Sequence, residues 1–236
     1  MTRMRPVPPM LAAATDDSPA RRRARAARLR GLYAATPDLA DTADLVARVE
    51  AAIAGGVCAI QYRSKAADGA LRREQAAALA RLPAIRRALF IVNDDAALAA
   101  AVGADGVHLG EDDGSIDDAR KELGPGRIIG VSCYDDVARA EAAAAAGADC
   151  VAFGSFRASG VKPAARRAEP SLLLRARRLG LPVVAIGGIT AGNAPDLIRA
   201  GADAVAVITA VFGAPDVTGV ESAARALCAA LDQRAA

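Results

Sequence analysis

The 236-residue sequence contains no tryptophan, a single histidine and only four cysteines. The cysteines are widely spaced and form no Cys-x-x-Cys pair: Cys58, Cys133, Cys150 and Cys228. Structural zinc sites need clustered Cys and His ligands, and disulfide frameworks need paired cysteines, so neither class of protein fits. We expect buried free thiols in a protein of the reducing cytoplasm.

Long apolar runs and basic surface stripes are also missing. No apolar run reaches the roughly 18 residues of a membrane span. The net charge is only +3, and much of it lies in the first thirty residues. The run Arg21–Arg25 is followed by neither an apolar segment, as in a secretory signal, nor interleaved aromatic residues, as in a nucleic-acid site. We therefore expect no membrane or nucleic-acid partner, and we interpret residues 1–28 as a mobile basic N-terminal arm.

From residue 29 to 236 the sequence alternates short β-branched runs with alanine-rich helical stretches, which is typical of β-α units and a parallel sheet. The predicted strands cover residues 31–36, 57–63, 88–93, 106–109, 127–132, 150–154, 182–187 and 204–209. The predicted helices cover residues 43–54, 71–81, 95–102, 116–123, 137–146, 171–178, 194–200 and 220–231. Eight such units fit one catalytic domain of this length.

A Gly-Ala-Asp triplet recurs at residues 103–105, 147–149 and 201–203, each time between a predicted helix and a predicted strand. Glycine closes a helix by adopting the left-handed conformation there. The copies precede the fourth, sixth and eighth strands, so the repeating unit is a pair of β-α modules. This pattern favours closure into a (β/α)8 TIM barrel of the α/β class. An open, doubly wound sheet would instead have a glycine-rich turn after its first strand, where this chain has Thr-Pro-Asp.

Barrel enzymes place their sites at the carboxyl ends of the strands, and several strand ends here are polar. The second predicted strand ends in Gln61-Tyr62-Arg63-Ser64-Lys65. Alternation puts Gln61, Arg63 and Lys65 on one side, where two cations and an amide suit a di- or triphosphate ligand. A strand that runs out into a solvated, charged loop has the same composition, so this run alone leaves both interpretations open.

Acidic residues follow the third and fourth predicted strands, as Asn93-Asp94-Asp95 and Glu111-Asp112-Asp113. Asp94 or Asp95 also suits the cap of the next helix. A capping box at Ser115 leaves the second acidic run without a structural role. Asp94 and Asp113 would place two carboxylates opposite the cations, a pattern that favours Mg²⁺ bound to a diphosphate. We expect His108, the lone histidine, to be structural rather than a base, because no acid is positioned to orient it.

The later strands add a second polar group. Ser132 ends the fifth strand, and a long loop over residues 153–163, which includes Lys162, suits a lid. Gly187-Gly188 follows the seventh strand, at the edge where barrels often bind phosphate. The sequence therefore predicts a metal-diphosphate site on strands two to four and a monophosphate site on strands seven and eight.

These motifs, in this order, resemble the thiamine-phosphate synthase family over about residues 30–232. The resemblance is carried by the runs at 61–65, 92–94, 103–110, 129–132, 185–189 and 206–212. It implies a transferase that joins 4-amino-2-methyl-5-(diphosphomethyl)pyrimidine to 4-methyl-5-(2-phosphoethyl)thiazole, or to its carboxylated form. It also implies a dissociative mechanism, in which pyrophosphate leaves first and the thiazole nitrogen traps a pyrimidinylmethyl cation.

The resemblance further implies roles for individual residues. The pyrimidine diphosphate would be bound by Gln61, Tyr62, Arg63, Ser64, Lys65, Asn93, Ser132 and Lys162, with Arg63, Lys65, Ser132 and Lys162 catalytic. The thiazole phosphate would be bound by Ser159, Gly160, Val161, Gly188, Ile208 and Thr209, and Mg²⁺ by Asp94 and Asp113. The chain departs from the family at residues 158–162, where Ala-Ser-Gly-Val-Lys replaces a Pro-Thr-x-Thr-Lys run, and at Tyr134, where histidine is frequent.

Two other functions stay open alongside this one. A thiazole tautomerase is a related barrel that binds only the thiazole phosphate, and the metal-diphosphate residues argue against it. A non-catalytic sensor of phosphorylated ligands would bind both substrates without releasing pyrophosphate. Two small phosphorylated substrates are the expected partners, and a homo-oligomer is an open alternative.

Overall fold

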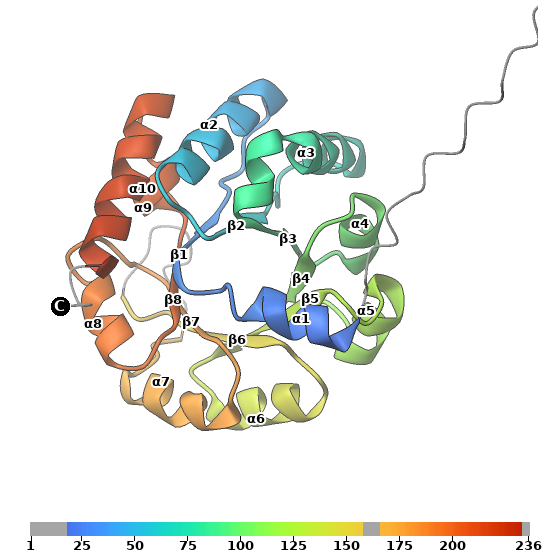
Figure 1. Cartoon of the computed structure of the whole chain (residues 1–236), viewed down its shortest axis with the longest axis vertical. Coiled ribbons are helices and arrows are strands. Elements are labelled where there is room, and N and C mark those ends of the chain that lie inside the picture. The colour runs from blue at the N-terminus through green and yellow to red at the C-terminus, as the bar shows by residue number, and fades with distance from the viewer. Residues whose placement is uncertain (1–17, 158–165, 233–236) are drawn as a thin grey trace, which may run out of the picture.

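The computed structural model describes residues 18–157 and 166–232 and forms a closed (β/α)8 barrel, as the sequence predicts (Figure 1). The parallel strands pair in chain order, and β8 pairs with β1. The strands are β1 (Gly31–Ala35), β2 (Ala59–Tyr62), β3 (Leu89–Asn93), β4 (Gly106–Leu109), β5 (Ile128–Tyr134), β6 (Cys150–Phe153), β7 (Val183–Ile186) and β8 (Ala204–Val207). Each strand overlaps its predicted range.

Helices surround the strands as an outer ring (Figure 1). The ring consists of α2 (Thr42–Ala54), α3 (Gly69–Arg81), α4 (Ala96–Ala101), α5 (Ile116–Leu123), α6 (Val137–Ala145), α7 (Ser171–Ala176), α8 (Ala194–Arg199) and α10 (Val217–Asp232). Two short 3₁₀ helices, η1 (Pro83–Arg87) and η2 (Arg177–Leu179), complete the connections. Among the residues described, no helix combines the length and apolar character needed to cross a membrane.

One boundary differs from the prediction at the end of β8. The β-branched run Val207-Ile208-Thr209 predicts an extended chain, but the strand ends at Val207 and a short helix, α9 (Thr209–Phe212), follows. The amide of Phe212 donates to the carbonyl of Ile208 at 2.9 Å, and the Val211 and Phe212 side chains are buried. Burial of this apolar pair outweighs the local preference for strand.

The strand register determines which side chains enter the barrel. His108 on β4 pairs with Gly130 on β5, and Gly130 pairs with Cys150 on β6, so the three residues form one inward-facing row. The barrel interior is filled by an apolar cluster that includes Leu29, Tyr33, Ala59, Leu89, Ile91, Ile128, Cys150, Ala152, Val184, Ala204 and Ala206. All four cysteines are free; Cys133 and Cys150 are buried, whereas Cys58 and Cys228 are half-buried.

The Gly-Ala-Asp repeats have a structural role at the amino ends of the strands. Each glycine has a positive φ, 71° at Gly103, 92° at Gly147 and 117° at Gly201. Each aspartate exchanges two hydrogen bonds with the preceding strand: Asp149, for example, donates its amide to the Ile129 carbonyl and accepts the Ile129 amide on Oδ2. The repeat therefore joins strands pairwise, as the doubled module predicts.

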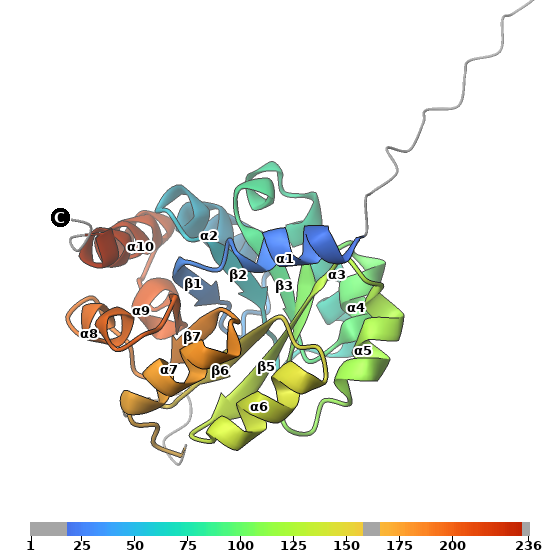
Figure 2. The same cartoon turned by 60° about the horizontal axis from the view of Figure 1, so that its bottom comes forward.

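The expected arm, residues 1–28, contains a helix where the structure describes it. Helix α1 (Pro19–Ala26) begins at the Ser18 cap and lies across one end of the barrel (Figure 2). Arg22 pairs with Asp149 at 2.8 Å and Arg25 with Asp105 at 3.1 Å, so two repeat aspartates bind this helix. Local sequence patterns do not reveal these ion pairs, because the paired residues are 80 and 127 positions apart. Residues 1–17 lie outside the described residues.

Candidate active site

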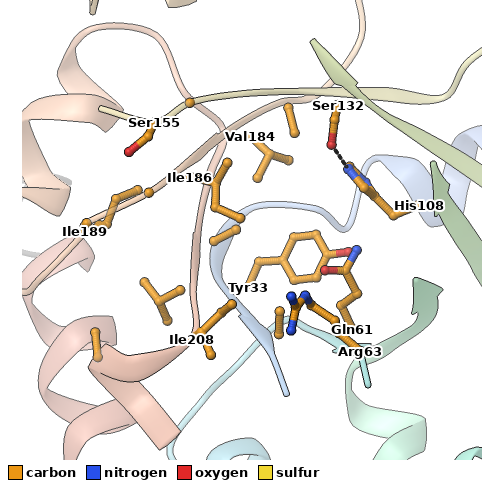
Figure 3. Close-up of a pocket in the computed structure, with 18 of the residues that line it drawn as sticks. Tyr33, Gln61, Arg63, His108, Ser132, Ser155, Val184, Ile186, Ile189 and Ile208 are labelled. Atoms are coloured by element: carbon orange, nitrogen blue, oxygen red, sulfur yellow. Dashed lines mark hydrogen bonds between the residues drawn. The ribbon is translucent and has the colours of Figure 1, made fainter. Parts of the chain in front are cut away.

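A cavity of about 620 Å³ opens at the carboxyl ends of the strands. Figure 3 shows its two unlike sides: Val184, Ile186, Ile189 and Ile208 on one side, and Gln61, Arg63, His108 and Ser132 on the other. The polar side chains come from β2 and the residue after it, from β4 and from β5. The apolar ones come from β7 and the segments that follow β7 and β8. The floor includes Tyr33, which is buried and belongs to the interior cluster. Such a cavity can hold a flat organic ligand against one wall and a charged group against the other.

Arg63 is held at the cavity by the loop that follows β1. Its Nη1 lies 3.3 Å from Oδ2 of Asp38, and its backbone amide and carbonyl both bond the Thr36 hydroxyl, at 2.8 and 2.9 Å. Burial raises the pKa of Asp38, but hydrogen bonds from the Lys65 and Ala66 amides and the Arg63 charge outweigh it, so the pKa is lowered. A charged carboxylate therefore fixes the direction of the Arg63 guanidinium.

A charged cluster lies at the carboxyl ends of β2, β3 and β4 and consists of Lys65, Asp94 and Asp113. The ammonium group of Lys65 bonds Oδ2 of Asp94, and Asp113 accepts the Gly110 amide at 2.7 Å. Burial and then a side-chain hydrogen bond with Asp94 raise the pKa of Asp113, although the Gly110 amide and the Lys65 charge oppose this shift. Two carboxylates crowd each other here, beside a cation.

This carboxylate pair fits a hard divalent cation. Within residues 18–157 and 166–232 no cluster of three or more His, Cys, Asp or Glu side chains is arranged as metal ligands. Mg²⁺ commonly takes only one or two protein carboxylates and completes its shell with phosphate oxygens and water. Burial is the largest cause of the raised pKa of Asp113 and the neighbouring Asp94 is the next, and a cation between the two carboxylates would oppose both.

Asp95, and not Asp94, caps helix α4. Asp95 accepts the Leu98 amide at 2.8 Å and is the cap. Asp94 has a φ of 65°, an uncommon value for a residue with a side chain, and faces Lys65. Strain of this kind is frequent at functional sites. The Ser115 hydroxyl accepts the Asp118 amide at 3.0 Å, as the predicted capping box requires.

His108 and Ser132 form a hydrogen-bonded pair in the cavity wall, with Nε2 and Oγ 2.9 Å apart (Figure 3). Burial lowers the pKa of His108 to about 4, although the Asp113 charge opposes the shift. The imidazole is therefore neutral near pH 7, and its Nε2 can either donate to or accept from the serine hydroxyl. The ring helps to set the direction of that hydroxyl toward a ligand.

The predicted phosphate edge also borders the cavity. Gly188, Ile208 and Thr209 all line it, and Gly187 and Gly188 have φ values of 101° and 64°. A side chain at Gly187 would collide with Ser155, since its Cβ would lie 2.4 Å from the serine Oγ. Glycine at this position thus lets β6 and β7 meet closely at the cavity rim.

Not all predicted residues come together. Gln61, Arg63, Asn93 and Ser132 line the cavity. The predicted metal ligands Asp94 and Asp113 line a second pocket instead, and Lys65 bonds Asp94. Tyr62 and Ser64 do not line the cavity, and the Tyr62 hydroxyl contacts Gln75 Oε1 at 2.9 Å behind the sheet. Ser159, Gly160, Val161 and Lys162 lie outside the described residues. The sequence interpretation missed Tyr33, Asp38 and Arg166, although the acid after the first strand was a usable signal for Asp38.

Comparisons with known proteins identify the family of the chain. The family model described as thiamine monophosphate synthase matches residues 32–211. The chain is 58% identical over 188 residues to a thiamine-phosphate synthase of Thiobacillus denitrificans, covering 79% of this chain and 89% of that protein. It is 54% identical over 201 residues to one of Aromatoleum aromaticum, covering 85% and 97%. The solved thiamine phosphate pyrophosphorylase of Pyrococcus furiosus superposes with a TM-score of 0.76 at 36% identity, covering 89% of this chain and 98% of that one.

Proposed function

The chain belongs to the thiamine monophosphate synthase family, and we propose that it acts on the two substrates that the sequence resemblance implies. Both substrates would bind in the cavity and react there. The protein is an enzyme, a transferase of thiamine biosynthesis that condenses pyrimidine and thiazole moieties. The finer proposal is that the pyrimidine enters as the 5-(diphosphomethyl) compound and the thiazole as the 2-phosphoethyl compound or its carboxylated form. Pyrophosphate and thiamine phosphate are then the products.

One observation carries this proposal: opposite charges gather at the carboxyl ends of β2, β3 and β4, where Lys65 bonds Asp94 and Asp94 lies beside Asp113. Arg63 and Lys65 follow β2, and Asp94 and Asp113 follow β3 and β4. A diphosphate with a divalent cation is a ligand that satisfies both groups at once. A tautomerase that binds only a thiazole phosphate has no use for such an arrangement.

Asp94 and Asp113 are the residues that would hold Mg²⁺. When bound there, Mg²⁺ would neutralise negative charge that builds up on the departing diphosphate. Arg63 and Lys65 would add fixed positive charge to the same oxygens, and Lys162, from the loop after β6, would add another. Each of these side chains stabilises the leaving group, which is where charge develops in a dissociative reaction.

The other cavity residues would hold and orient the two rings. Gln61, Asn93 and Ser132 offer amide and hydroxyl groups to the pyrimidine, and the bond from His108 directs the Ser132 hydroxyl. Backbone groups at Gly188, Ile208 and Thr209 suit the thiazole phosphate, with Ser159, Gly160 and Val161 as further contacts. The apolar wall would exclude water, so that the pyrimidinylmethyl cation is trapped by the thiazole nitrogen.

We infer that the partners are these two small phosphorylated molecules, with neither nucleic acid nor membrane involved, and that the enzyme acts in the cytoplasm. The absence of disulfides among the four cysteines is usual for proteins of a reducing compartment. Burial raises the pKa of Cys58 to about 11 and of Cys133 to about 12, which makes both thiols unreactive. The basic segment before residue 29 is proposed to lie outside the catalytic machinery.

The test is to incubate the purified protein with Mg²⁺ and both substrates and to measure thiamine phosphate by mass spectrometry. Asp113→Ala should lower kcat/KM by about 100-fold or more, since a metal contributes several kcal/mol to transition-state stabilisation. The adjacent, exposed Asp112→Ala is the matched control and should stay within about two-fold of wild type. Binding of both substrates without pyrophosphate release, or equal losses in the two variants, would contradict the proposal.

A further inference from the structure

Arg166 is a cation of the cavity wall that no sequence motif singles out. Its backbone carbonyl accepts the Ser155 amide at 2.9 Å, which fixes the chain beside the end of β6. Among the described residues that line the cavity, Arg63 and Arg166 are the ones that carry a permanent positive charge. Arg63 is already paired with Asp38. Among residues 18–157 and 166–232, Arg166 has no comparable carboxylate partner buried beside it.

The Arg166 guanidinium makes a cation–π contact with the ring of Tyr134, at the end of β5. It is 5.3 Å from the ring centroid, and Arg139 is 5.7 Å from the same centroid. The two arginines differ in how they are held. Arg139 donates to the Ser132 carbonyl at 2.8 Å and to the Gly110 carbonyl at 3.4 Å, so it ties two strand ends together.

Within the described residues, the charged partner of Arg166 is Glu111, at 3.6 Å, and Glu111 also lies 3.8 Å from Arg139. The Arg166 side chain is 57% exposed and that of Glu111 is 45% exposed. Ion pairs as exposed as this one contribute little, about 0–1 kcal/mol. The guanidinium is thus positioned by the tyrosine ring, while its hydrogen-bonding groups can exchange one anion for another at small cost.

The Tyr134 ring lies near the chain after β4, which carries Asp113, a proposed Mg²⁺ ligand. Glu111 follows Gly110, whose amide bonds Asp113, and a Cβ at Gly110 would lie 3.7 Å from the Tyr134 hydroxyl. The Arg166 guanidinium therefore lies near the chain after β4 that carries Asp113, whereas Arg63 and Lys65 follow β2. A diphosphate bound at the metal would come between these cations.

We propose that Arg166 binds the diphosphate of the pyrimidine substrate, with the diphosphate oxygens taking the place of the Glu111 carboxylate. This inference rests on the proposed function and adds a specificity residue to it. The planar guanidinium offers two parallel N–H donors to neighbouring phosphate oxygens, a geometry that a lysine ammonium cannot reproduce. Glu111 competes for the same donors in the empty enzyme and so limits the affinity.

The test compares four full-length variants by steady-state kinetics, varying each substrate separately. Arg166→Ala should raise KM for the pyrimidine diphosphate about ten-fold to a hundred-fold, as expected for a charge-assisted hydrogen bond, and leave KM for the thiazole phosphate unchanged. Arg166→Lys should fall between wild type and Arg166→Ala. Glu111→Gln should lower KM for the pyrimidine diphosphate, because the competing carboxylate is gone. Arg167→Ala, an exposed neighbouring cation, is the control and should match wild type.

Equilibrium binding of inorganic pyrophosphate with Mg²⁺ provides a second readout that does not depend on turnover. Arg166→Ala should weaken it by the same factor as KM, whereas Arg167→Ala should not. The inference is overturned if Arg166→Ala leaves pyrimidine-diphosphate KM and pyrophosphate binding within two-fold, or if only the thiazole phosphate KM changes. It is also overturned if Glu111→Gln raises KM together with a loss of thermal stability, the result of a merely structural pair. Absence of product from the wild type would instead refute the proposed function.

Discussion

The repeat aspartates allow a sharp test of how the amino ends of the strands are held together. Asp149 and Asp203 occupy equivalent positions in two Gly-Ala-Asp copies, but their surroundings differ. Asp149 is 7% exposed and contacts both Arg22 and Arg120, at 2.8 and 2.6 Å. Asp203 contacts only one guanidinium among the described residues, that of Arg30 at 3.4 Å, and Arg30 is 75% exposed.

Replacing either aspartate by alanine removes the same backbone interaction. Ile129 donates its amide to Asp149 at 2.9 Å, and Val183 donates its amide to Asp203 at 3.0 Å. Leaving such a buried donor without a partner costs about 1–3 kcal/mol. We therefore expect about 2 kcal/mol of destabilisation from this cause in both Asp149→Ala and Asp203→Ala.

The ion pairs make the expected loss of stability larger in Asp149→Ala than in Asp203→Ala. An exposed pair such as Arg30–Asp203 contributes about 0–1 kcal/mol. Breaking a buried pair by removing one partner costs about 3–5 kcal/mol, and the lower part of that range applies to Asp149 because Arg120 keeps carbonyl partners at Gly124 and Gly147, both at 3.3 Å. Since the two contributions overlap, we expect a total loss of about 4 kcal/mol for Asp149→Ala and about 2 kcal/mol for Asp203→Ala.

Urea unfolding followed by circular dichroism measures the difference directly. With a urea dependence of about 2 kcal/mol per molar, a gap of about 2 kcal/mol separates the two midpoints by about 1 M. Arg30→Ala serves as a control and should leave the midpoint nearly unchanged. Equal midpoints for Asp149→Ala and Asp203→Ala would refute the reasoning, because they would mean that the guanidinium groups on Asp149 add nothing to stability.

Two further predictions concern the cavity wall. Because burial lowers the pKa of His108 to about 4 from its ordinary 6.5, the unfolded chain binds more protons between these values, and stability should fall as the pH drops from 6.5 toward 4. His108→Gln should flatten that part of a plot of urea midpoint against pH; an unchanged slope would contradict the assignment. Gly130→Ala would place a Cβ 2.7 Å from His108 Nδ1 and 2.9 Å from Cys150 Sγ, so it should cost about 1–3 kcal/mol and reduce kcat through Ser132, which a thermal melt and an activity assay can detect.

The order of the strands could be predicted from the sequence because the signals are local. Each Gly-Ala-Asp triplet marks a helix end and a strand start within a few residues, and the observed strands overlap the predicted ones. Alternation along β2 likewise predicts that Gln61 and Arg63 share a face, and both line the cavity. The same alternation argues against Tyr62 as a ligand contact, and its buried hydroxyl bonds Gln75 instead.

The features that could not be predicted depend on contacts between distant segments. Asp38 contacts Arg63 only because β1 and β2 are neighbours with their carboxyl ends level, and 25 residues separate the two side chains. Arg22 finds Asp149 across 127 positions, so no local pattern marks α1 as part of the barrel. Arg166 reaches Tyr134 through the path of the chain after β6. Local periodicity carries no information about contacts between residues so far apart in the sequence.

The closed barrel also explains how one cavity can separate charge from an apolar wall. Inward positions on β6 and β8 carry small side chains such as Ala152 and Ala206, which leave space, whereas β2 to β5 carry the polar ones. Closure places these two groups of strands on opposite sides of one axis. On the proposed mechanism, the departing diphosphate would move toward the charged side while the organic cation would stay against the apolar side. Such a division favours capture of the cation by the thiazole ring over its capture by water, because water solvates the charged side of the cavity and is excluded from the apolar side.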